Sequence, residues 1–399
     1  MIMGNAFKTG EYTNIFAELG YAQEEIDKRL NNDFNTVFFG PEDERIYHET
    51  GDDMGYMVDT GNNDARTEGM SYGMMIALQF NRKDIFDRIW KWSKTYMYHE
   101  DGPSKGYFAW SAKLDGTRNA QGPAPDGELF YAMSLLFASN RWGDGEGIFN
   151  YAKEAKELLH EMVHKPDDAN PGPMFDPGNK YIRFVPNMKN TDPSYHLPHF
   201  YELFALWGNP GDSNFFREAA AAAREFLRIT CHPVTGLSPE YANYDGTPLN
   251  MRNHHNFFSD AYRTAANIGL DYEWFGADEW QVQNSDNIQR FFCETVKGKE
   301  DLIYAIDGTP VTDPGQLVKS EPEGVHTTVL HPVGLMATNA QASLAAKGKY
   351  RLECAKKLWD TPLRKGPRRY YDNLLYMFAL LAVSGNYRIY GKYYSGSKR

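Results

Sequence analysis

The sequence predicts an all-α protein, and more narrowly an (α/α)6 barrel of six inner and six outer helices. Segments with the 3.6-residue apolar period recur along the 399 residues, whereas signals for β-strands are sparse. Six of these segments are apolar on nearly every side, as buried helices are, and five of the six are followed by a segment with one charged face. This alternation is typical of a closed ring of helix pairs.

The six apolar segments are rich in small and aromatic residues, as in MSLLFAS and YMFALLAVSG. We expect them to form the inner helices, because a helix that is apolar all round is stable only when it is covered on all sides. Their predicted starts lie near Thr67, Asp126, Tyr195, Ser259, Pro332 and Tyr371.

The amphipathic segments are predicted to form the outer helices, with the charged face in solvent. Five of them follow an inner helix, at residues 83–97, 150–165, 215–230, 278–296 and 349–360. The sixth is predicted near the N-terminus, in YAQEEIDKRLNNDF, where it would close the ring. Because no linker-like stretch divides the chain, residues 1–399 are predicted to form a single domain.

The charge balance narrows the classes of partner. A net charge of −11 and a pI near 5.5 argue against nucleic acid and anionic membranes as partners, and favour a neutral substrate.

The longest apolar run, LLYMFALLAV, is too short to span a bilayer, and the N-terminus lacks the apolar core of a signal peptide. Cys231, Cys293 and Cys354 have no disulfide-like spacing and are expected to be small buried residues. We therefore predict a cytoplasmic protein without a nucleic-acid, membrane or obligatory protein partner.

Acidic residues recur at the starts of the predicted inner helices. In a ring of helix pairs the inner helices run parallel to one another, so their N-termini share one rim. This rim would gather Glu68, Asp126, Tyr195, Asp260, His331 and Asp372. For any one of the acids, helix capping is the alternative explanation, since acidic residues are favoured near helix N-termini.

Glu68 is the acid that capping explains least well, because Thr67 or Asp64 could cap the helix and its neighbours are apolar. Apolar surroundings raise the proton affinity of a carboxyl group, as a general acid at neutral pH requires. Arg263 follows Asp260 by one helical turn and could pair with it, which would keep Asp260 ionised as a general base must be. One carboxyl group that keeps its proton, together with one that stays ionised, suggests glycoside hydrolysis.

Other chemistries have weaker support in the sequence. His196 and His199 have an HxxH spacing, but structural or sugar-contacting roles are favoured over metal ligation, and we predict no metal site. The absence of a GxSxG elbow argues against a serine hydrolase, and no glycine-rich phosphate loop follows a predicted strand.

Six blocks between Asp59 and Asn373 are similar to a known family. They read DTGNNDARTEGMSYGMMIA, GPAPDGE, DPSYHLPHFYELFALWG, FFSDAYRTAANIGLD, LHPVGLMATNA and RRYYDN. These blocks resemble glycoside hydrolase family 8 and, within it, the reducing-end xylose-releasing exo-oligoxylanases. The resemblance implies an (α/α)6 barrel, hydrolysis with inversion of the anomeric configuration, and no metal or organic cofactor.

The resemblance also implies roles for individual residues. Glu68 in RTEGMSYG would be the general acid and Asp260 in FFSDAYR the general base. Asp126 in PAPDGE would hold the sugar at the cleavage site, and His331 in LHPVG would close the reducing-end side of the cleft. Further candidates for substrate binding are Trp110, Tyr195, Arg263 and Tyr371. Since inversion needs room for a water molecule, we expect the two catalytic carboxyl groups to lie about 6.5–9.5 Å apart.

The predicted substrate is a β-1,4-xylo-oligosaccharide from whose reducing end xylose is released. An endo-acting β-1,4-glucanase, chitosanase or xylanase of the same family is the main alternative, because it would share the fold and the two carboxylates. A non-catalytic sugar-binding barrel, and a sugar epimerase or isomerase on a similar barrel, also stay open at this point.

Overall fold

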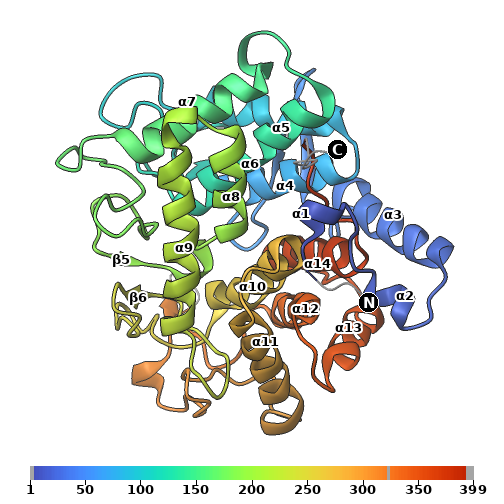
Figure 1. Cartoon of the computed structure of the whole chain (residues 1–399). Helices are drawn as coiled ribbons and strands as arrows, with labels where there is room; N and C mark the ends of the chain where they lie inside the picture. The colour runs from blue at the N-terminus through green and yellow to red at the C-terminus, as the bar shows by residue number, and fades with distance from the viewer. Residues whose placement is uncertain (1–3, 321–323, 392–399) are drawn as a thin grey trace, which may run out of the picture.

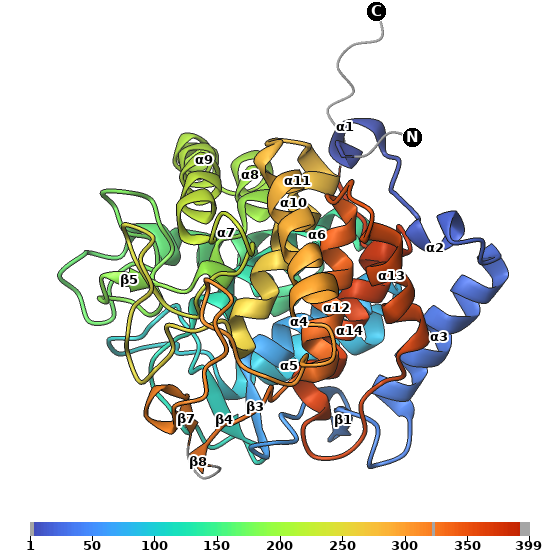
Figure 2. The ribbon, with the colours of Figure 1, turned by 90° about the horizontal axis from the view of Figure 1, so that it is seen from below.

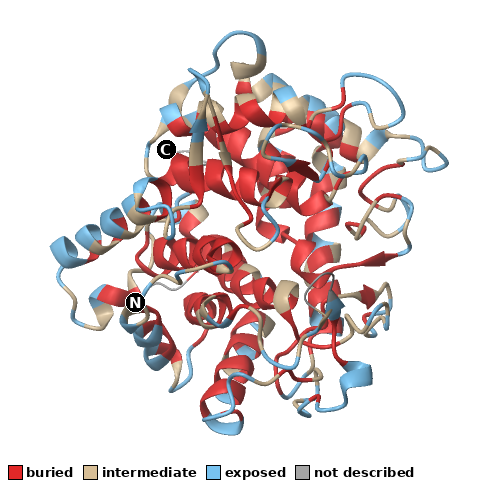
Figure 3. Ribbon diagram, turned by 180° about the vertical axis from the view of Figure 1, so that it is seen from behind, coloured by how far each residue is buried: buried red, intermediate tan, exposed pale blue. Residues whose placement is uncertain are grey.

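The computed structural model describes residues 4–320 and 324–391, and this part of the chain is mostly helical. Six helices lie at the centre, as predicted, and are buried along most of their length (Figure 3). They are α4 (Thr67–Gln79), α6 (Pro125–Trp142), α8 (Pro198–Trp207), α10 (Tyr262–Phe275), α12 (Pro332–Gln341) and α14 (Arg369–Val383).

Six further helices surround the central ones (Figure 1). They are α3 (Gln23–Phe39), α5 (Lys83–Tyr96), α7 (Tyr151–His164), α9 (Ser213–Thr230), α11 (Trp280–Arg290) and α13 (Arg351–Asp360). The N-terminal segment adds two short helices, α1 (Ala6–Thr9) and α2 (Ile15–Glu18).

The inner helices contact one another in the order in which they occur along the chain, and the last of them contacts the first. Each inner helix contacts the next, from α4 through α6, α8, α10 and α12 to α14, and α14 contacts α4. The outer helices α5, α7, α9, α11 and α13 each pack on the inner helix that precedes them, while α3 packs on α14. Helix α3 is thus the sixth outer partner, as predicted from the segment YAQEEIDKRLNNDF.

Prolines define where three of the inner helices begin. Pro125, Pro198 and Pro332 occupy the first turn of α6, α8 and α12. Proline is well placed there because its fixed φ suits a helix and its missing N–H would have no intrahelical acceptor.

The start of the third inner helix differs from the prediction. Tyr195 does not begin the third inner helix but lies in a separate 3₁₀ turn (Pro193–Tyr195), and α8 begins three residues later at Pro198.

The segments that connect the helices form short antiparallel strand pairs, several of which lie at one end of the molecule (Figure 2). They are β1 (Tyr47–Thr50) with β2 (Met54–Met57), β3 (Asp64–Arg66) with β4 (Ser111–Lys113), β5 (Asn190–Thr191) with β6 (Ala242–Asn243), and β7 (Lys319–Ser320) with β8 (Gly324–Val325). Since β3 runs directly into α4, the strands β1, β3, β4, β7 and β8 lie at the end where this inner helix starts, while α1 lies at the opposite end (Figure 2).

The inner helices and the outer faces that cover them form one main hydrophobic core, whose buried residues extend from Ala6 to Ile389 along the chain. All three cysteines are buried and unpaired, as expected, although Cys293 and Cys354 bring their Sγ atoms to 3.8 Å from each other. None of the helices in the described part of the chain combines the length and apolarity that a membrane span requires.

Candidate active site

A buried arginine joins the acidic residues at the starts of three inner helices. Arg263, in the first turn of α10, donates from Nη1 to Glu68 Oε2 at 2.8 Å and to Asp126 Oδ2 at 3.2 Å. Its other terminal nitrogen, Nη2, lies 3.4 Å from Asp260 Oδ1. These three acids therefore lie together, as the sequence predicted for the shared rim, and all three contact one guanidinium group.

A fourth carboxylate belongs to this cluster and was not among the predicted site residues. Asp192 is fully buried, and its Oδ2 lies 3.7 Å from Arg263 Nη2. Its other oxygen accepts a hydrogen bond from the Ser194 backbone N–H at 2.7 Å. The sequence signal for it was weak, since Asp192 precedes a 3₁₀ turn and not one of the inner helices.

Four carboxyl groups around one guanidinium cannot all be ionised without a large electrostatic penalty. Burial raises the pKa of Glu68 to about 8, and the neighbouring Asp126 and Asp260 add to this effect, while Arg263 opposes it. Burial also raises the pKa of Asp126, and that of Asp192 still further. Glu68 is thus suited to hold a proton at neutral pH.

Tyr370 supports Glu68 from the other side. Its hydroxyl donates to Glu68 Oε1 at 3.0 Å, so both carboxyl oxygens of Glu68 have a fixed partner. The glycine after Glu68 makes this approach possible, because a Cβ atom at Gly69 would lie 2.4 Å from the Tyr370 ring. Tyr370 was not among the predicted site residues, although it lies beside the predicted Tyr371 in the same RRYYDN block.

Asp260 occupies a different environment from Glu68. It lies in a 3₁₀ turn (Ser259–Ala261) ahead of α10, and its side chain is 31% exposed against 16% for Glu68. The backbone N–H of Asp260 donates to Glu240 Oε1 at 3.3 Å. Asp260 therefore faces solvent, whereas Glu68 is the more enclosed of the two carboxyl groups.

Glu240, which is buried, and His254, which is half-buried, form a pair behind Asp260. His254 Nδ1 lies 2.7 Å from Glu240 Oε2, and the Tyr241 ring stacks on the imidazole at 4.5 Å. Burial raises the pKa of Glu240 to about 7, although the contact with His254 acts against it. This pair anchors the loop that presents Asp260, and neither residue was predicted to have a role.

Aromatic side chains border the arginine on two sides. The rings of Tyr195 and Tyr371 lie 5.5 Å and 5.7 Å from the Arg263 guanidinium carbon. The imidazole of His331 packs edge-on against Tyr371, with ring centroids 4.8 Å apart. Three of the predicted substrate-binding residues therefore lie around the acidic cluster.

Asp372, the remaining acid of the predicted rim, is paired with a different arginine. It is fully buried and accepts hydrogen bonds from the Gly334 backbone N–H at 2.6 Å and from Arg364. His331 Nδ1 lies 3.4 Å from its second oxygen. Asp372 thus ties the start of α14 to the start of α12 and orients His331.

Trp110 lies at the edge of the site. Its backbone carbonyl accepts a hydrogen bond from the Thr67 N–H at 2.9 Å, one residue before Glu68. Trp110 is 38% exposed as a whole residue, its ring lies 5.3 Å from the Arg66 guanidinium, and it lines a groove of about 720 Å³. Other residues that line this groove include His99, Pro103, Arg118, Pro171 and Val185.

The histidines considered as metal ligands are structural. His196 and His199 are completely enclosed, and burial lowers their pKa values to about 3 and about 4. His196 stacks on Phe226, and His199 contacts Trp274 edge-on. Each therefore packs as an aromatic side chain of the core, which is one of the two roles, structural or sugar-contacting, that the sequence favoured over metal ligation.

Comparisons with known proteins agree with these features. Residues 50–385 match the model of the glycosyl hydrolases family 8. The reducing-end xylose-releasing exo-oligoxylanase Rex8A of Paenibacillus barcinonensis is 53% identical over 388 residues, which cover 96% of this chain and 98% of that protein. The reducing end xylose-releasing exo-oligoxylanase of Halalkalibacterium halodurans is also 53% identical over 388 residues, with 96% of each chain covered. The solved structure of Rex8A complexed with xylose is similar to this fold with a TM-score of 0.91 at 52% identity, and the match covers 97% of this chain and 100% of that one. This chain therefore belongs to glycosyl hydrolases family 8.

Proposed function

We propose that this protein is an inverting glycoside hydrolase that releases xylose from the reducing end of β-1,4-xylo-oligosaccharides. The observation that carries the proposal is the Arg263 cluster, which holds an enclosed carboxyl group and a solvent-facing carboxylate around one cation. The similar Rex8A and its Halalkalibacterium halodurans counterpart are both named for this activity.

In the proposed reaction Glu68 is the general acid. Its raised pKa keeps a proton available, which it gives to the glycosidic oxygen as the bond to the anomeric carbon breaks and positive charge develops there. Asp260 is the general base and takes a proton from a water molecule that attacks the opposite face of the sugar. The separation of about 6.5–9.5 Å between the two carboxyl groups stays a prediction of this mechanism.

The neighbouring residues would bind and orient the substrate. Asp126, held by Arg263 and by the Gly127 N–H at 2.9 Å, is placed to accept hydrogen bonds from the sugar at the cleavage site. We assign to His331 and Tyr371 the wall that limits the reducing-end side of the cleft to one sugar. Trp110 offers an exposed ring on which a further sugar can stack.

Xylo-oligosaccharides are favoured as the substrate class by one further observation. A solved structure of a mutant of Rex8A, 52% identical to this chain, is complexed with 3(3)-alpha-L-arabinofuranosyl-xylotetraose.

We also infer that the ring of helix contacts is an (α/α)6 barrel that spans residues 1–399 as one domain. The reaction as proposed needs no metal or organic cofactor, and the cytoplasmic location stays a prediction.

Proton NMR on xylotriose with ¹³C only at the reducing-end C1 tests this proposal. We expect labelled xylose, together with unlabelled xylobiose that first appears as the α-anomer. Unlabelled xylose would mean attack at the other end, and a β-anomer would mean retention of configuration. Absence of cleavage, with turnover of carboxymethylcellulose or chitosan instead, would favour the endo-acting alternative.

Two variants test the assigned roles in the same assay. Glu68→Ala and Asp260→Ala should each lose nearly all hydrolysis while they keep the wild-type circular dichroism spectrum. Glu157→Ala is the matched control, since it removes an exposed carboxylate from the outer helix α7 and should leave the rate unchanged. A near-normal rate in either active-site variant would remove that residue from its role.

A further inference from the structure

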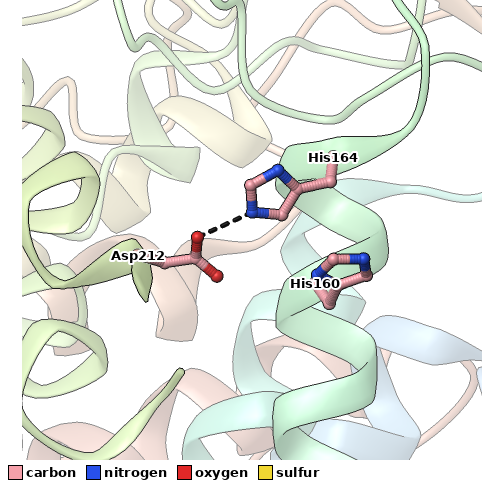
Figure 4. A group of neighbouring side chains, drawn as sticks. All are labelled: His160, His164 and Asp212. Carbon is pink, nitrogen blue, oxygen red and sulfur yellow. Dashed lines mark hydrogen bonds and ion pairs between the residues drawn. The ribbon is translucent and has the colours of Figure 1, made fainter. Parts of the chain in front are cut away.

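Three potential metal ligands meet on the outer surface, on elements that carry none of the residues of the acidic cluster. His160 and His164 project from successive turns of α7, and Asp212 faces them from the 3₁₀ turn (Pro210–Asp212) that precedes α9 (Figure 4). One ligand atom from each lies within 4.8 Å of the others. His164 Nε2 already contacts Asp212 Oδ1 at 2.6 Å, and the two imidazole rings lie 4.6 Å apart.

This donor set suits zinc. Two imidazole nitrogens and one carboxylate oxygen are ligands that Zn²⁺ prefers, and a water molecule commonly completes its tetrahedron. Ligand atoms around a tetrahedral zinc are roughly 3.4 Å apart, given metal–ligand distances of about 2.1 Å. Because His160 is exposed, a rotation of its side chain can bring its nitrogen to that distance.

Asp212 makes the group partly preorganised. Its side chain is only 8% exposed, so it is held in position by packing at the start of α9. The His164–Asp212 contact places the second ligand beside Asp212, and zinc binding would replace this 2.6 Å contact with two metal–ligand bonds, with the two ligand atoms roughly 3.4 Å apart. A cavity of about 530 Å³ lies beside His160, and Lys153, Lys156 and Asn209 also line it, so the His160 side chain has room to move.

We propose that His160, His164 and Asp212 form a zinc-binding site that links α7 to α9. The prediction of no metal site overlooked a signal for it, since residues 160–164 read HEMVH and have the HExxH spacing of zinc metalloproteases. In those enzymes the glutamate is the general base. Here Glu161 pairs instead with Lys165 at 2.9 Å, and its Cγ packs beside Gly106. The site is therefore proposed to stabilise the fold and not to hydrolyse peptides.

Titration calorimetry with ZnCl₂ on the metal-free full-length protein tests the site. We expect one Zn²⁺ per chain, with an affinity that falls at least about tenfold in His160→Gln, since loss of even an outer-shell partner costs about 10–100-fold in metal affinity. His164→Gln should show the same loss. His48→Gln, which removes an imidazole from β1, is the matched control and should bind zinc as the wild type does.

Thermal unfolding provides the second measurement. Zinc should raise the unfolding temperature of the wild type and of His48→Gln, because a ligand that binds only the folded state stabilises it, and should do so much less for His160→Gln. Equal zinc affinities for the wild type and His160→Gln would overturn the proposal, as would an equal temperature shift. Hydrolysis of xylotriose should be the same in His160→Gln and the wild type, so this outcome is independent of the proposed activity.

Discussion

Replacement of Glu68 by glutamine should make the stability of the protein less dependent on pH. Burial raises the pKa of this carboxyl group from its ordinary value of 4.5 to about 8 in the folded chain. Between these two values the folded state keeps a proton that the unfolded state releases. The folded state is therefore favoured below pH 4.5 and loses this contribution as the pH rises through about 8.

The size of the effect follows from the two pKa values. A difference of roughly 3.5 corresponds to about 5 kcal/mol, which is lost at about 1.4 kcal/mol for each pH unit. Glutamine is neutral at every pH, so the variant lacks this pH-dependent contribution to the free energy of unfolding. The free energy of unfolding of Glu68→Gln, relative to the wild type, should therefore increase by about 1.4 kcal/mol for each pH unit between about pH 5 and pH 7.5.

Urea unfolding followed by tryptophan fluorescence, at half-unit steps of pH, measures this difference. Glu157→Gln is the control for the loss of one carboxylate, since its side chain lies on the exposed face of α7. If the difference between Glu68→Gln and the wild type has the same slope with pH as that of Glu157→Gln, the argument from burial is wrong.

Three further predictions concern the same site. First, kcat/KM on xylotriose should fall about tenfold for each pH unit above about 8, because the free enzyme then loses the Glu68 proton; a profile flat to pH 10 would exclude Glu68 as the acid. Second, Gly69→Ala should lower the free energy of unfolding by about 1–3 kcal/mol, because its Cβ would lie 2.4 Å from the Tyr370 ring. Thermal unfolding checks this against Gly122→Ala, whose Cβ would meet open space and should have little effect. Third, His331→Ala should allow internal cleavage of long xylan, visible as longer products in chromatography, and an unchanged product pattern would contradict the proposed wall.

The helix pairs were predictable because each depends on local sequence. An apolar helix such as α14 and an amphipathic one such as α9 differ in periodicity over a single segment, and helix formation is a local choice. The start of α8 was predicted wrongly, although Pro198 in the sequence was a signal for it. The acids at the helix starts were also visible, since Glu68 and Asp126 lie in the first turns of α4 and α6.

The partners of those acids were not predictable, because they come from distant segments. Arg263 does lie beside Asp260, one turn away, as the spacing suggested, but its shorter contacts are to Glu68 and Asp126, which belong to other helices. Nothing in the local sequence of Asp192 indicates that its carboxyl group reaches the same guanidinium. The same holds for Cys293 and Cys354, which are far apart in the chain and in contact in the fold.

The amino-acid sequence alone predicts the six inner and six outer helices, their order and which of them are amphipathic, and it places carboxylates at the starts of several inner ones. Which of these carboxyl groups holds a proton is set by tertiary packing, since the pKa of Glu68 depends on burial and on charges brought from other helices. Likewise, HEMVH is a pattern of one helix, but Asp212 joins it only because α7 and the turn before α9 pack together. Local propensities specify helices, whereas electrostatic sites arise where packed helices bring distant side chains into one low-dielectric environment.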